Sequence, residues 1–233
     1  MSCINEPEIS GDCMRMSLVD TLRHVDGRII LDCDGVLLRW EDGFRRFIEQ
    51  AHGVSLDPAG PAHYDLRGWL PDSLFERSSE LIEAFCTDPT LGFGDLGPLR
   101  GAVELISSLN TIGIRPSIAT ACSTSPAIQT ARIDNLDRVF GADAFSEVRF
   151  AELHGSKVSI LKSMPCSFYL DDHPGHVVDA QNLGHDSYAM ASSHTPVLMQ
   201  NPEFSGIRWI AELEMISSAI GDAYREARSP VWH

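Results

Sequence analysis

The sequence predicts an α/β protein with a five-stranded parallel sheet, helices on both faces of that sheet, and a small, mainly helical domain inserted after the first strand. Three features indicate this fold. Residues 29–31 form a short apolar run typical of a strand buried on both faces. From residue 101 onward, helical patterns alternate with strand patterns, as in parallel sheets. Between these two parts, residues 38–98 interrupt the alternation and have mainly helical patterns.

Length, charge and cysteine content exclude several classes of protein. A chain of 233 residues can form one domain with a sizeable insertion. The net charge of -15, from 33 acidic against 18 basic residues, argues against nucleic-acid and membrane-surface partners. The six cysteines are scattered, which disfavours a disulfide framework or a zinc site and favours a cytoplasmic location. We find no membrane-spanning run and no signal-peptide pattern.

The first part of the chain is predicted to contain a leader, one strand and the insertion. Residues 1–24 have the composition of a polar leader that ends in a short helix. The first strand is expected over residues 28–32. Within the insertion, residues 43–52 and 73–86 place apolar side chains on one face of a helix. The insertion as a whole is expected to span residues 38–98, with loops between its helices.

The remaining segments, residues 25–37 and 99–233, are expected to form the core. Ser125 and Pro126 are typical of a helix start, and glycines follow several of the helical patterns. The predicted strands after the insertion cover residues 115–120, 147–150, 167–171 and 187–191. The predicted helices cover residues 101–111, 126–138, 174–183 and 209–225, with a further helix that starts at residue 156. Strict alternation of this kind implies a parallel sheet joined by helical crossovers.

Acidic residues stand at the ends of two predicted strands. Asp32 and Asp34 follow the first strand, and Asp171 and Asp172 follow a later one. Open α/β sheets bind ligands at the carboxyl ends of their strands. Side chains alternate along a strand, so Asp32 and Asp34 should share one side while Cys33 packs inside. Two carboxylates this close repel each other unless a cation or a shared proton separates them. An acidic turn closing an ordinary strand would give the same local pattern.

Two other polar residues occupy comparable positions. Thr120 ends the predicted strand 115–120. The only two lysines, Lys157 and Lys162, both lie between that strand and the second acidic pair. Lys157 stands at the expected start of a helix, so it is better placed than Lys162 to reach the sheet edge. A lysine at a helix start is usually a solvated surface residue. The functional interpretation therefore depends on the combination of positions.

Taken in order, Asp-x-Asp-Gly-Val, a strand-terminal Thr, a Lys and an Asp-Asp pair resemble the motifs of the haloacid dehalogenase superfamily. The resemblance extends over residues 29–184. The corresponding residues are Asp32-Cys33-Asp34-Gly35-Val36, then Thr120, then Lys157, then Asp171-Asp172. This resemblance implies a Rossmann-like three-layer sandwich in which the first and fourth strands lie side by side. The four aspartates would then share one crevice.

The resemblance also implies a metal ion. Four clustered carboxylates cannot all stay ionised without a cation, and their hard oxygen atoms suit Mg²⁺. By resemblance, the carboxylates of Asp32 and Asp171 and the backbone carbonyl of Asp34 would bind Mg²⁺ directly. Asp172 would bind the metal through a water molecule. Mg²⁺ is therefore the expected cofactor.

The implied reaction is hydrolysis of a small phosphorylated substrate through an aspartyl-phosphate. Asp32 would attack phosphorus, while Asp34 would protonate the leaving oxygen and then activate water. Thr120, Ala121 and Lys157 would bind the phosphoryl oxygens. Dehalogenases of the superfamily lack the second aspartate, so Asp34 indicates a phosphate substrate. Phosphonate-cleaving members need a lysine in the insertion, and this insertion has none.

The insertion corresponds to the small helical cap that closes over the site in many members. Residues 34–40 and 64–69 are faintly similar to the 5′-nucleotidase branch, whose cap presents aromatic side chains to a nucleobase. A nucleoside monophosphate is therefore one candidate substrate. Trp40 and Phe44 are the aromatic candidates for substrate contact because they follow the catalytic loop. The other aromatic residues of the insertion are expected to form its core.

Two alternative functions stay open from the sequence. A phosphomutase would use the same four motifs but return the phosphoryl group to its substrate, with a bisphosphate as activator. A non-catalytic binding protein could keep the fold, although such members usually lose one of the first two aspartates. The sequence determines neither the exact substrate, which depends on cap loops, nor the oligomeric state.

Overall fold

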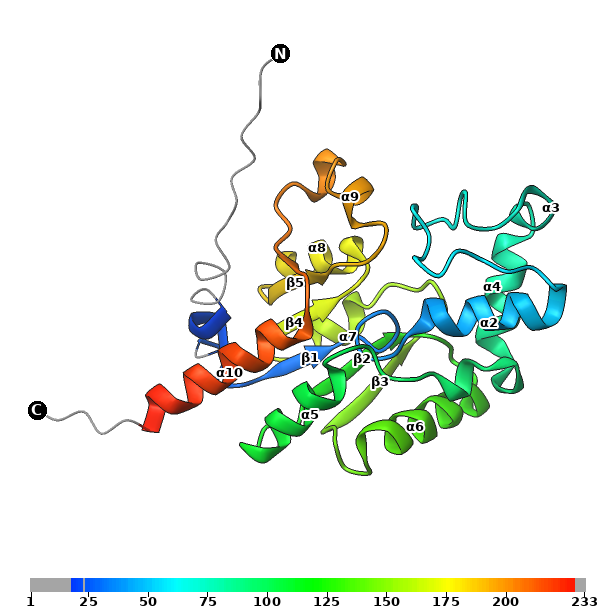
Figure 1. The fold of residues 1–233 in the computed structure, drawn as a ribbon. Helices are drawn as coiled ribbons and strands as arrows, with labels where there is room; N and C mark the ends of the chain where they lie inside the picture. Colours follow the sequence, from blue (N-terminus) through cyan, green and yellow to red (C-terminus); the bar gives the residue numbers. More distant parts are fainter. Residues whose placement is uncertain (1–17, 23, 229–233) are drawn as a thin grey trace, which may run out of the picture.

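A computed structural model of the protein describes residues 18–22 and 24–228. Its centre is a parallel sheet with the strand order β3-β2-β1-β4-β5-β6 (Figure 1). The strands are β1 (Ile29–Leu31), β2 (Ser117–Ala121), β3 (Glu147–Ala151), β4 (Phe168–Asp171), β5 (Asp186–Met190) and β6 (Trp209–Ile210). All five strand pairings are parallel. The α/β class and the parallel sheet are thus confirmed, and β1 lies between β2 and β4 at the centre of the sheet.

The sheet has six strands, whereas the sequence predicts five. The additional strand, β6, pairs Trp209 with Ala189 and Ile210 with Met190 of β5. Residue 209 was expected to begin the closing helix, but that helix, α10 (Leu213–Arg228), begins after β6. A strand of two residues is too short to show an alternating pattern. Only its pairing with β5 makes it recognisable.

Helices cover both faces of the sheet, which gives three layers (Figure 1). The alternation along β1 divides its side chains between two apolar clusters. Ile29 and Leu31 pack with residues of α5 (Ala102–Thr111), α6 (Pro126–Phe140) and α10. Ile30 packs on the other face with residues of α7 (Val158–Lys162) and α8 (Pro174–Asn182). Burial on both faces explains the continuous apolar run of this strand.

The chain between β5 and β6 contains two short helical segments that the sequence did not indicate. These are α9 (Thr195–Leu198) and η3 (Pro202–Phe204). Each begins with a proline within its first turn, where the missing amide hydrogen costs nothing. Both segments follow the carboxyl end of β5, so they border the edge of the sheet where the acidic residues lie.

Residues 18–22 are helical, as predicted, but they belong to the core and not to a leader. Leu18, Val19 and Leu22 are buried in the same apolar cluster as Ile29 and Leu31. The Thr21 hydroxyl also lies 3.2 Å from the phenolic oxygen of Tyr188, in β5. The rest of the predicted leader, residues 1–17, lies outside the described residues.

The insertion leaves the core and returns to it at one narrow connection. Leu38 pairs with Pro98 in an isolated antiparallel bridge, and the Arg39 amide donates to the Gly97 carbonyl at 2.9 Å. Its helices are α2 (Trp40–His52), α3 (Asp72–Phe75) and α4 (Ser78–Thr87), followed by the short segments η1 (Pro89–Leu91) and η2 (Phe93–Asp95). The Leu38–Pro98 bridge closes off the segment that contains these helices, and its helical character is as predicted.

Two helix boundaries in the insertion differ from the prediction. Helix α2 begins at Trp40, three residues before the expected start. It ends at His52 and is followed by Gly53 in the left-handed conformation that glycine tolerates. The helix predicted over residues 73–86 is two helices, α3 and α4. Arg77 interrupts it with φ -104° and ψ 11°, outside helical geometry. Because the apolar residues keep a similar spacing across this break, the sequence pattern does not reveal it.

Candidate active site

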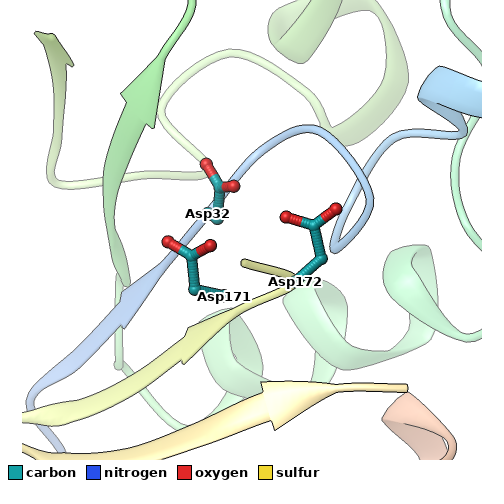
Figure 2. Close-up of side chains that lie close together, drawn as sticks. All are labelled: Asp32, Asp171 and Asp172. Carbon is teal, nitrogen blue, oxygen red and sulfur yellow. The ribbon is translucent and has the colours of Figure 1, made fainter. Parts of the chain in front are cut away.

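Three aspartates converge at the carboxyl edge of the sheet. Asp32 follows β1, Asp171 ends β4, and Asp172 comes next in the chain (Figure 2). One carboxylate oxygen of each lies within 4.8 Å of those of the other two. The cause is the register of the sheet, in which Leu31 of β1 lies beside Leu170 of β4. The residues that follow these two leucines therefore meet. Cys33 is fully buried in the core, as predicted.

Lys157 lies between two of these carboxylates. It immediately precedes α7, and its side chain is 1% exposed. The Lys157 Nζ atom lies 2.8 Å from Asp32 Oδ1 and 2.7 Å from Asp171 Oδ2. Lys162, at the other end of α7, is exposed. The structure therefore brings Lys157, and not Lys162, to the acidic residues.

The charges of this cluster are unbalanced. Burial raises the pKa of Asp32 to about 7, Lys157 opposes this rise, and the Asp171 charge adds to it. Burial and the charges of Asp32 and Asp171 raise the pKa of Asp172 well above its usual range. Despite its burial, Asp171 has a lowered pKa because Lys157 and His176 stabilise its anion. The single positive charge of Lys157 thus offsets only part of the negative charge of several carboxylates. This imbalance favours the binding of an additional cation.

Asp171 is fixed by three further contacts that the sequence analysis did not identify. The Tyr169 hydroxyl donates to Asp171 Oδ2, and the His173 amide donates to Asp171 Oδ1 at 2.8 Å. The His176 Nδ1 atom lies 3.4 Å from Oδ2. Tyr169 and Asp171 are two residues apart on β4, so strand alternation alone would have placed them on one side.

The donor atoms at this site fit Mg²⁺. They are carboxylate oxygens, which Mg²⁺ prefers. The Cys33 amide and Lys157 both contact Asp32 through Oδ1, at 2.7 and 2.8 Å, so Oδ2 is left for a cation or a substrate. A Cβ atom on Gly35, whose φ is +76°, would collide with Asp172 Oδ2. The loop after β1 can therefore approach Asp172 only because residue 35 is glycine.

A cavity of about 810 Å³ opens above these residues, between the core and the insertion. The predicted phosphate-binding residues all line it: Thr120 and Ala121 at the end of β2, and Lys157. Asp32, Asp34, Asp171 and Asp172 line it too. The sequence-predicted catalytic, metal-binding and phosphate-binding residues are thus gathered around one space.

Only one of the two predicted aromatic contacts reaches this cavity. Trp40 lines it, but Phe44 is fully buried and does not. Phe44 stacks on Trp40 with ring centroids 4.9 Å apart and packs against Trp69 and Phe85. The expectation that Phe44 contacts the substrate is therefore wrong. Helix α2 begins three residues earlier than predicted, and Phe44 faces the core of the insertion.

Comparisons with known proteins bear on the fold. No protein-family model matches the sequence, and no curated protein matches it. Solved structures do match. Protein Tyrosine Kinase A of Mycobacterium tuberculosis is 19% identical, with 83% of this chain and 97% of that chain covered and a TM-score of 0.57. A haloacid dehalogenase-like hydrolase of Streptococcus pneumoniae is 14% identical, with coverages of 82% and 97% and a TM-score of 0.54.

A predicted phosphatase of Clostridium acetobutylicum is 12% identical, with 84% of this chain and 98% of that chain covered and a TM-score of 0.54. The fold is haloacid dehalogenase-like. This result confirms the fold that the sequence motifs implied, including the adjacent strands β1 and β4. At such low identity, the likeness concerns the fold alone. The activity of such a fold depends on the residues of its site.

Asp34 has a partner in this haloacid dehalogenase-like core that the motifs did not indicate. Its carboxylate oxygens accept hydrogen bonds from Arg132 Nη2 at 2.8 and 3.0 Å. Arg132 comes from α6 and is fully buried, with its guanidinium 3.8 Å from the centroid of the Phe93 ring. Burial raises the pKa of Asp34, although Arg132 and Lys157 partly offset the rise. The side chain of Asp34 thus lies apart from the three-aspartate cluster.

Arg132 also links Asp34 to the insertion. Its Nη1 atom donates to Asn135 Oδ1 at 3.1 Å. Asn135 in turn accepts from the Leu96 amide and donates to the Leu96 carbonyl, at the end of the insertion. No pattern in the sequence could reveal these contacts, because residues 34 and 132 are 98 positions apart.

Replacing Arg132 by Met is expected to lower the free energy of unfolding by about 3 kcal/mol or more, because a largely buried carboxylate loses its partner. Arg138→Met, on the same helix, provides the matched control. Arg138 pairs with Asp95 at the surface, and such pairs contribute less than about 1 kcal/mol. Urea unfolding of both variants measures the difference. Equal losses would contradict the structural role assigned to Arg132.

Proposed function

We propose that this protein is a Mg²⁺-dependent phosphatase that hydrolyses a small phosphorylated metabolite through an aspartyl-phosphate on Asp32. The observation that carries the proposal is the convergence of Asp32, Asp171 and Asp172 beside the buried ammonium group of Lys157. The fold supports it only in general terms, since similar structures include proteins described as a kinase and as a hydrolase. The site supports it more specifically.

In this proposal, Asp32, Asp171 and the Asp34 carbonyl would hold Mg²⁺ directly, and Asp172 would support it through a water molecule. The ion, when bound, neutralises charge on the transferred phosphoryl group. Asp32 attacks phosphorus, with its carboxylate oriented by the Cys33 amide and Lys157. Thr120, 1% exposed at the end of β2, and Lys157 stabilise the phosphoryl oxygens.

Asp34 carries the proton in both halves of the reaction. In the first half, the bond from Asp32 to phosphorus forms, the bond to the leaving oxygen breaks, and Asp34 protonates that oxygen. In the second half, Asp34 takes a proton from water as the water oxygen attacks phosphorus and releases Asp32. Its raised pKa favours the acid role, and Arg132 holds its carboxylate in one orientation.

Two more specific functions are possible for this site, a nucleoside monophosphatase and a phosphomutase. Activity assays distinguish them. The aromatic side chains that the insertion contributes to the cavity include Trp40 and Tyr64, which could stack on a nucleobase. Hydrolysis of a nucleoside monophosphate in preference to other phosphate esters would support that substrate. Product formation that requires a bisphosphate activator would identify a phosphomutase.

The proposal predicts that phosphate release from p-nitrophenyl phosphate requires Mg²⁺. Excess EDTA is expected to reduce the rate by roughly a hundredfold or more, because the clustered carboxylates would then repel the substrate phosphate. Addition of Mg²⁺ in excess of the chelator should restore the rate, which controls for irreversible damage. Full turnover in excess EDTA would refute the metal-dependent mechanism.

A further inference from the structure

One wall of the same cavity carries buried polar atoms that lack partners among the described residues. His194 lies between β5 and α9, is 3% exposed, and lines the cavity. Among the described residues, neither of its ring nitrogens has a hydrogen-bond partner, and neither does Ser192 Oγ. Leaving such a group unpaired costs about 1–3 kcal/mol. A ligand in the cavity that pairs with these atoms would remove that cost.

The insertion encloses these atoms from the other side. The Tyr64 ring packs against the His194 ring at a centroid distance of 5.2 Å and an angle of 84°. Ser193 Oγ donates to the Pro61 carbonyl at 2.6 Å, which fixes the loop of Tyr64 to the loop of His194. From α2, Glu41 Oε1 lies 3.8 Å from His194 Nδ1, too far for a hydrogen bond. We call Glu41, Tyr64, Ser192 and His194 the His194 pocket.

The chemistry of the His194 pocket suits hydroxyl groups. Burial lowers the pKa of His194 to about 4, so its ring is neutral at pH 7 and offers one donor and one acceptor. The Ser192 hydroxyl also donates and accepts. Burial raises the pKa of Glu41 to about 7. Its carboxyl group can therefore donate a hydrogen bond when protonated and accept one when ionised. A group that both donates and accepts hydrogen bonds matches all three.

The charge of the cavity disfavours a second anionic group on the ligand. Eight acidic side chains line it, against the two basic side chains of Arg39 and Lys157. Both basic side chains are already paired: Arg39 with Asp42 at 3.1 Å, and Lys157 with Asp32 and Asp171. A carboxylate or a second phosphate would therefore meet repulsion outside the phosphoryl site.

Building on the proposed phosphatase function, we infer that the His194 pocket binds the leaving group of the substrate, and that this group is a neutral polyhydroxylated alcohol. The substrate class is then the phosphate monoesters of sugars and sugar alcohols. Hydroxyls of such a group satisfy His194 and Ser192, while the phosphoryl group reaches Asp32, which lines the same cavity.

The test compares two esters of equal chain length, sorbitol 6-phosphate and n-hexyl phosphate. In the native protein, kcat/KM is expected to favour the hydroxylated ester by about tenfold or more, since unpaired polar groups in a site select for their partners. His194→Phe and Ser192→Ala should both shift this ratio towards one, and His194→Gln, which keeps a donor and an acceptor, should shift it less. His52→Phe, at the end of α2 and outside the cavity lining, should keep the native ratio.

p-Nitrophenyl phosphate separates failure of this inference from failure of the proposed function. If the native protein hydrolyses it but shows no preference for the hydroxylated ester, the inference is wrong and the phosphatase stands. The same conclusion follows if His194→Phe and Ser192→Ala lower turnover of both esters equally, or if adenosine monophosphate or phosphoglycolate is the better substrate. If p-nitrophenyl phosphate is not hydrolysed, the phosphatase assignment fails, and the inference fails with it.

Discussion

Asp32→Asn is expected to abolish phosphate release, with a loss of roughly four orders of magnitude or more, as for removal of a catalytic nucleophile. The amide cannot attack phosphorus, and it is a poorer ligand for Mg²⁺. The change is nearly isosteric, and the contact of the Cys33 amide with an oxygen at this position can persist. Release of p-nitrophenol and of phosphate, both measured with Mg²⁺ present, reports the effect.

Asp34→Asn is the matched comparison, because it removes an acid and base without removing the nucleophile. p-Nitrophenol is a good leaving group that needs little protonation, so Asp32 should still be phosphorylated in this variant. Hydrolysis of the aspartyl-phosphate would be slow because no base activates water. We therefore expect a small burst of p-nitrophenol, followed by accumulation of phosphorylated protein in Asp34→Asn and none in Asp32→Asn.

Trapping with radiolabelled substrate and acid quench locates the phosphoryl group. Asp34→Asn also weakens the contact with Arg132, so its melting temperature should be recorded beside its kinetics. A labelled residue other than Asp32 would overturn the assignment of the nucleophile. Phosphorylated protein in Asp32→Asn would do the same.

Lys157→Met is expected to lower kcat/KM by about a hundredfold or more, as for loss of one preorganised charge in a dry site. Lys157 contacts both Asp32 and Asp171, so its removal affects the position of the nucleophile as well as the charge near the phosphoryl group. Methionine keeps most of the length and apolar character of the side chain. The variant should therefore report on the ammonium group more than on packing.

Lys162→Met is the matched control, since Lys162 is exposed at the other end of the same short helix. We expect no more than about a twofold effect, as for a solvated charge outside the site. Melting temperatures of both variants separate loss of folded protein from loss of activity. A larger loss in Lys162→Met than in Lys157→Met would contradict the placement of Lys157 in the site.

Local sequence patterns predicted those features of the fold that have a local physical cause. Strand β1 was recognised because burial on both faces requires a continuous apolar run. The meeting of Asp32 with Asp171 and Asp172 was predictable because parallel strands bring their carboxyl ends to one edge. Tyr169 could have been found in the same way from its spacing to Asp171. By contrast, β6 was missed because two residues cannot show a period.

The sequence by itself determined the α/β class, the parallel sheet and which residues stand at the strand ends, because chain periodicity and polarity decide these features. Only the tertiary structure decided which partners these residues meet. It paired Asp34 with Arg132, buried Phe44 in the insertion, and brought Tyr64 over His194. Each of these contacts joins segments far apart in the chain or depends on where a helix begins. Their physical cause is the packing of the insertion and α6 against the sheet edge, which no local pattern encodes.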